Sequence, residues 1–176
     1  MANADSNTPA RPEITTPSTV IAGSLTALLK KPQGAAMDLF QVLDICQSYA
    51  DVLIDYDNHA EYMALCGRLL AGLNILKVVL KAPLPEHLIN ALTVDSKKPD
   101  EDRCPLSTDS ETLCGYCASL TLLLLNQQES PEQEEQIAGM LFEMINLLAE
   151  DLKAPRFVRS AKGLVMISGE AVPGIH

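Results

Sequence analysis

Apolar residues recur every three or four positions through four long stretches of the chain, which is the spacing of the buried side of an amphipathic α-helix. The first stretch begins near residue 36, and the second follows it closely and stops at Pro83. A third begins near residue 109, and a fourth begins near residue 130 and stops at Pro155. Because two long helices with a short connection fold as an antiparallel pair, the pattern predicts one hairpin at 36–83 and another at 109–155.

Shorter segments surround the two hairpins. Residues 1–17 hold three prolines among small polar residues and are predicted to be a disordered tail. A short helix is expected between residue 18 and Pro32. Residues 84–108 are expected to be a linker with one brief helix at 86–92, and residues 156–176 a C-terminal tail, either docked on the helices or free to bind a partner. Residues 18–176 then form a single domain.

The two predicted hairpins resemble each other in sequence. The run Leu-Lys-Ala-Pro at 80–83 recurs at 152–155, and the same offset of 72 places Gly67 on Gly139. Chance similarity between leucine-rich helices is the alternative. A single hairpin cannot bury its apolar side alone, so two copies predict an all-α fold, a four-helix bundle built from two tandem, related hairpins.

The repeat also pairs polar and small residues. Asn74 and Asn146 fall at matching places in apolar runs, so they either bind each other across a pseudo-twofold axis and fix the register, or lie at the edge and contact water. Gly67, Gly72 and Gly139 are unfavourable inside helices, and we expect close helix approach to explain them, either inside the bundle or against a partner.

Composition limits the function. The 176 residues carry a formal charge of −10, with 47% apolar residues, 4% aromatic residues and no Trp. An acidic chain with few aromatic residues is unlike proteins that bind nucleic acids directly. The first residues do not resemble a secretory signal, and no apolar run reaches the roughly 20 residues of a membrane span. Five cysteines, an odd number, fit a reducing compartment, so a cytoplasmic location without membrane association is expected.

Cys114 and Cys117 form a Cys-x-x-Cys motif, which can make a disulfide or ligate a metal. With Tyr116 between the cysteines, the motif resembles that of the alkylhydroperoxidase-like, carboxymuconolactone decarboxylase family, an all-α family. The resemblance covers four residues and implies a redox pair, but Thr121 stands where that family has its proton-relay histidine. The alternative is that both are small core residues, since Cys117 matches Cys46 in the repeat.

Neither a metal site nor a phosphotransfer site has a complete set of residues. Cys104, Cys114 and Cys117 with His87 offer four zinc ligands, but no second Cys-x-x-Cys or paired histidines accompany them. His59 resembles the exposed histidine of histidine phosphotransfer domains, although the Lys and Gly that follow it there are missing. No metal and no cofactor are therefore predicted.

Charged residues gather in three places. Such clusters are usually solvated surfaces, and the alternative is that they dock a partner protein. These candidate docking residues are Asp100, Glu101, Asp102, Glu129, Glu132, Glu134, Glu135, Arg156, Arg159 and Lys162.

The sequence contains no paired acid and base, nucleophile constellation or phosphate loop. We therefore expect a non-catalytic protein–protein interaction module, such as a regulator, adaptor, inhibitor or assembly factor, with another protein as partner and with homo-oligomers left open. One alternative is a small thiol-redox protein that uses Cys114 and Cys117. A second is a carrier of apolar ligands in the core, lined by Met37, Met140 and Met144.

Overall fold

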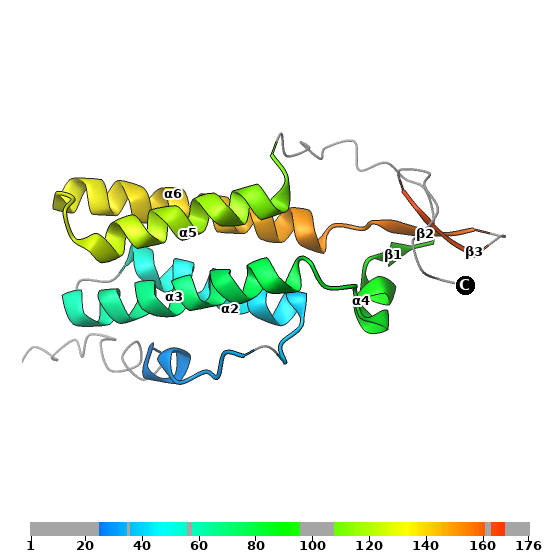
Figure 1. Ribbon diagram of the computed structural model, residues 1–176, viewed down its shortest axis with the longest axis horizontal. Helices are drawn as coiled ribbons and strands as arrows, with labels where there is room; N and C mark the ends of the chain where they lie inside the picture. Colours follow the sequence, from blue (N-terminus) through cyan, green and yellow to red (C-terminus); the bar gives the residue numbers. More distant parts are fainter. Residues whose placement is uncertain (1–24, 35, 56–57, 96–107, 161–162, 168–176) are drawn as a thin grey trace, which may run out of the picture.

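The computed structural model describes residues 25–34, 36–55, 58–95, 108–160 and 163–167. It is mostly helical, with a small three-stranded sheet (Figure 1). The predicted long helices are present as α2 (Leu39–Ile54), α3 (His59–Val79), α5 (Ser110–Asn126) and α6 (Pro131–Lys153). Residues 25–29 are also helical, within the short helix that was predicted. The predicted tail at 1–17 lies outside the described residues.

Each long helix begins at a polar residue whose side chain accepts a hydrogen bond from the first turn. Asp38 and Ser130 form complete capping boxes with Gln41 and Gln133, while Asn58 and Asp109 cap α3 and α5. Such caps satisfy backbone N–H groups that have no partner inside the helix. The starts of α2 and α5 are 71 residues apart, and those of α3 and α6 are 72 apart.

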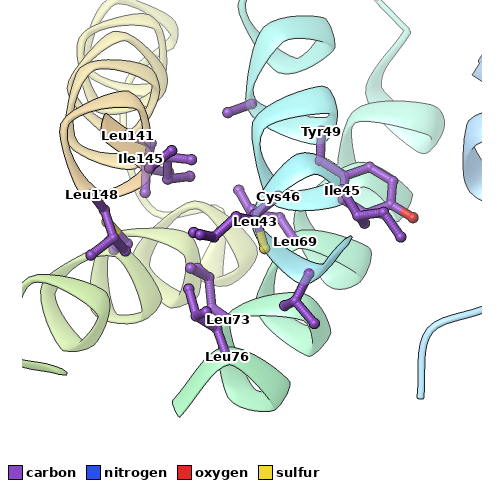
Figure 2. Close-up of a cluster of buried hydrophobic side chains, with 14 of the residues drawn as sticks. Leu43, Ile45, Cys46, Tyr49, Leu69, Leu73, Leu76, Leu141, Ile145 and Leu148 are labelled. Atoms are coloured by element: carbon purple, nitrogen blue, oxygen red, sulfur yellow. The ribbon is translucent and has the colours of Figure 1, made fainter. Parts of the chain in front are cut away.

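The four long helices surround one apolar core. α2 packs against α3 and α6, and α5 packs against the same two helices. Lys153 of α6 reaches Asp44 of α2 at 2.6 Å, and Lys81, just beyond α3, reaches Glu111 of α5 at 2.8 Å. Figure 2 shows Leu43 and Cys46 of α2 directed toward apolar side chains of the neighbouring helices. The core includes Leu43, Cys46, Leu65, Leu69, Leu73, Leu76, Cys114, Cys117, Leu124, Leu141, Ile145 and Leu148.

Residues 25–34 cover one side of the α2–α3 hairpin, away from α5 and α6 (Figure 1). Leu25 and Leu28 are buried there, and the hydroxyl of Tyr49 donates to the carbonyl oxygen of Leu28 at 3.2 Å. The guanidinium of Arg68 donates to the Tyr49 hydroxyl and to the carbonyl of Lys31. Two backbone carbonyls of this segment, those of Leu28 and Lys31, are therefore bound by side chains of α2 and α3.

The mostly helical structure agrees with the all-α prediction, and a small sheet that was not predicted accompanies the helices. β1 (Thr93–Val94) follows the short helix α4 (Glu86–Ala91) and pairs parallel with β2 (Phe157–Ser160), which pairs antiparallel with β3 (Gly163–Met166). Residues assigned to a linker and a tail thus join at one end of the helices (Figure 1). Gly163 has φ +110°, a conformation that glycine adopts without the steric cost of a side chain.

Close helix approach explains only one of the three helical glycines. A Cβ at Gly72 would lie 2.8 Å from Cys46 Sγ and 3.3 Å from Gln33 Nε2, so this position must be small. A Cβ at Gly67 or Gly139 would meet nothing within 4 Å. The packing explanation is therefore right for Gly72 and wrong for Gly67 and Gly139 within this chain.

Candidate protein-binding surface

The cysteine pair lies in the core. Cys114 and Cys117 are fully buried on α5, with Cys46 of α2 close enough for their charges to interact, and Cys114 Sγ lies 3.5 Å from the carbonyl oxygen of Leu73. Burial raises the pKa of Cys114 to about 11 and the pKa values of Cys46 and Cys117 to about 12. Since the thiolate is the reactive form, this environment opposes the chemistry of a redox pair and favours a packing role.

The residues that were considered as zinc ligands do not come together where the structure describes them. His87 is exposed at the start of α4 and binds Asp38 at 3.0 Å, whereas Cys114 and Cys117 are in the core; Cys104 lies outside the described residues. Burial opposes ionisation of Asp38, but hydrogen bonds from Gln41 and His87 outweigh it and lower the pKa of this carboxyl. Within the described ranges, no group of three or more His, Cys, Asp or Glu side chains is placed to hold a metal ion.

A pocket of about 440 Å³ lies at the end of the helices where α2 ends and α3 and α6 begin. His59 lines it, and its ring nitrogen Nε2 lies 3.2 Å from the side-chain amide oxygen of Gln127. The Tyr62 hydroxyl lies beside the Cys66 thiol, and burial raises the pKa of both groups. The pocket is lined by Leu53, Ile54, His59, Tyr62, Pro131, Glu134, Glu135 and Ala138, and by no methionine.

Where the structure describes them, the candidate docking residues with charged side chains lie at opposite ends of the helices. Glu132 and Glu134 stand in the first turn of α6, where acids favour the helix dipole, and Glu134 and Glu135 line the pocket. Glu129 accepts a hydrogen bond from the backbone of Gln128.

The basic candidates are partnered at the other end of the helices. Arg156 lies 4.0 Å from Asp151, and Arg159 lies 3.7 Å from Asp95. Asp100, Glu101, Asp102 and Lys162 lie outside the described residues.

The two asparagines do not pair with each other. Asn146 Oδ1 accepts a hydrogen bond from Gln47 Nε2 at 2.8 Å, which joins α6 to α2. Asn74 is exposed on α3. The predicted register pair is therefore absent, and Asn74 faces water, which was the alternative interpretation.

Large apolar side chains are exposed where α5 and α6 run side by side. Ser110 Oγ donates to Asp151 at 3.1 Å, so the start of α5 lies beside the end of α6. Because the two helices are antiparallel, counting forward from Ser110 and backward from Asp151 gives the residues at the same height. Tyr116 is then level with Ile145, and Leu123 with Ala138. Helical spacing then brings one group to the solvent side of the seam, which we call the α5–α6 face: Tyr116, Leu120, Leu123, Met140, Met144 and Leu147.

The exposure of this face is substantial. The exposed fractions are 53% for Tyr116, 53% for Met140, 46% for Leu147 and 38% for Leu123. α5 has one charged residue in 17, Glu111, which is bound to Lys81. A group of exposed large apolar side chains on a helix pair is typical of a binding site for a protein or a membrane.

α3 also has an uncharged outer side. Among the described helices it alone is long and apolar enough by composition to cross a membrane. The core helix of a water-soluble protein passes the same test, and α3 contributes Leu65, Leu69, Leu73 and Leu76 to the core. Helix length and composition therefore give only weak support for a membrane span.

Comparison with protein-family models, with curated proteins and with solved structures finds no match. The function is therefore argued from the surface itself.

Proposed function

We propose that this protein is a non-catalytic protein-binding module, a four-helix bundle of two related hairpins that presents the α5–α6 face to a partner. The observation that carries the proposal is the set of large apolar side chains on a charge-free helix surface. Complete burial of one such side chain is worth about 1.5–3 kcal/mol, and because these side chains are already about half buried, a partner that covers one gains about half of this.

The helix bounds and caps support the repeat. Offsets of 71 and 72 superpose the starts of the helices, and Asp38 and Asp109 are matching caps of α2 and α5. Buried positions correspond as well, since Cys46 matches Cys117 and Leu73 matches Ile145. A bundle made of two copies keeps two equivalent outer seams, one in each hairpin.

Affinity capture from a lysate of the native cells tests the binding function. The tagged full-length protein is compared with Leu123→Asp, which charges the α5–α6 face, and with Val78→Asp, which charges an exposed apolar position on α3 (68% exposed). We expect a stoichiometric partner with the unmodified protein and with Val78→Asp, and its loss with Leu123→Asp. Equal capture by all three, or no partner for any, contradicts the proposal. Unchanged helical circular dichroism in each variant shows that the fold is intact.

A further inference from the structure

The α2–α3 seam, the counterpart of the α5–α6 face in the repeat, is already occupied by this chain. Tyr49, Arg68 and Gly72 all contact residues 25–33: Tyr49 binds Leu28, Arg68 binds Lys31, and Gly72 lies against Gln33. Gln33 Nε2 also donates to the carbonyl of Arg68 at 3.1 Å. The segment that covers this seam begins with a short helix whose leucines are three residues apart. The stretch that follows is bound through the backbone carbonyl of Lys31.

The residues that contact the segment at 25–33 have apolar counterparts on the α5–α6 face, where none of the described segments packs in this way. With the offsets of the repeat, Tyr49 corresponds to Leu120, Arg68 to Met140 and Gly72 to Met144. Ile45, 7% exposed, corresponds to Tyr116, which is 53% exposed. The two hairpins therefore differ in the burial of this seam. Residues 25–33 cover the seam between α2 and α3, whereas no segment that the structure describes covers the matching seam between α5 and α6.

We propose that the α5–α6 face binds a short amphipathic helix of a partner protein, seated as residues 25–33 are seated on the α2–α3 hairpin. The inference rests on the function proposed above and specifies its surface and ligand. An occupant with leucines at Leu-x-x-Leu spacing places two apolar side chains on one side of its helix, as Leu25 and Leu28 do.

The charged residues beside the α5–α6 face indicate which residues should flank the leucines of the partner helix. Along α6, Glu143 and Glu150 are exposed beside the face, and Lys153 is the only basic residue of α5 and α6. The helix at 25–29 is followed by two exposed lysines, Lys30 and Lys31. A partner helix with basic residues next to its leucines complements the acidic border, and binding should weaken as salt increases.

A peptide taken from this chain is the direct probe. A labelled, acetylated peptide with the sequence of residues 24–33, SLTALLKKPQ, is titrated with the full-length protein and followed by fluorescence anisotropy. We expect saturable binding that weakens at least tenfold in Met140→Glu and in Tyr116→Asp and stays within twofold in Val78→Asp. A peptide with alanine in place of its three leucines should not bind. Thermal unfolding of each variant checks that the fold is intact.

Three results would overturn the inference. Binding that survives both Met140→Glu and Tyr116→Asp places the peptide elsewhere, for example in exchange with the segment at 25–33. A dimer in sedimentation velocity that Met140→Glu converts to a monomer assigns the face to a second copy of the chain. Absence of peptide binding rejects this class of ligand, and the capture experiment with Leu123→Asp then still decides whether the face binds any protein.

Discussion

Replacing Gly72 by alanine tests the tightest contact between α2 and α3. Alanine is about 1 kcal/mol more favourable than glycine inside a helix, so Gly→Ala in open space stabilises the chain by about that amount. At Gly72 the added Cβ would stand 2.8 Å from Cys46 Sγ, closer than carbon and sulfur can approach. Cys46 is fully buried in the core, so its sulfur has little room to move. Overpacking of this kind costs about 1–3 kcal/mol, which offsets or exceeds the propensity gain.

The change in the free energy of unfolding should therefore differ in sign or size between Gly72→Ala and the same substitution at the other two glycines. Gly67→Ala and Gly139→Ala, which meet nothing within 4 Å, should each raise the free energy of unfolding by about 0.5–1 kcal/mol. Gly72→Ala should leave it unchanged or lower it by up to about 2 kcal/mol. Urea unfolding followed by circular dichroism measures all three.

A second substitution identifies the atom responsible. In a Cys46→Ala background the sulfur is gone, so Gly72→Ala should become neutral or stabilising, with a coupling energy of about 1–2 kcal/mol between the two sites. If Gly72→Ala stabilises the unmodified protein as much as Gly67→Ala does, the close approach of α2 and α3 at this level is refuted. A coupling energy near zero would assign the cost to Gln33, the other neighbour of Gly72.

Three other perturbations have defined outcomes. The four buried thiols have pKa values raised to about 11–12 by burial, so the folded chain keeps protons that the unfolded chain loses above pH 9. The thiol contribution to the free energy of unfolding should be constant below about pH 8 and fall above pH 9 by up to about 1.4 kcal/mol per pH unit for each thiol, as chemical denaturation at several pH values in this alkaline range will measure. Tyr49→Phe should lower stability by about 1 kcal/mol and speed amide exchange at residues 25–33, whereas Tyr116→Phe should change neither. Asn146→Ala should cost about 1 kcal/mol because Gln47 loses its acceptor, while Asn74→Ala should be neutral or slightly stabilising in the same unfolding assay.

The helices were predictable because each carries a long periodic pattern with a cap and a stop. The sheet was missed because its strands are two to four residues long, too short to show an alternating pattern. Its parallel pair joins Thr93 to Phe157, residues far apart in the chain, and no local signal specifies such a contact. The antiparallel pair did have a signal, since Gly163 follows one short apolar run and precedes another.

The candidate site was missed for a different reason. The charged candidates that the structure describes stand in the first turn of α6, line the end pocket or pair within the chain. The informative signal was the run of four leucines at 122–125, because successive residues of a helix point 100° apart and four in a row cannot all reach one core. Leu124 is buried, whereas Leu122 and Leu123 are exposed.

The chemical character of the open seam argues for a ligand rather than for simple loss of a cover. On the α2–α3 seam the covered positions include a tyrosine and an arginine that bind the covering backbone. In the proposed repeat, the matching positions on the α5–α6 face are Leu120 and Met140, which carry no polar group for such bonds, and Tyr116, which is larger than its proposed counterpart Ile45. A seam adapted to water would replace these side chains with charged ones, as the outer side of α6 does at Glu143 and Glu150. Instead the face is apolar and built around flexible methionines, which pack well against varied surfaces. Its ligand should therefore be held by its apolar side chains, with its backbone bonds satisfied within its own helix.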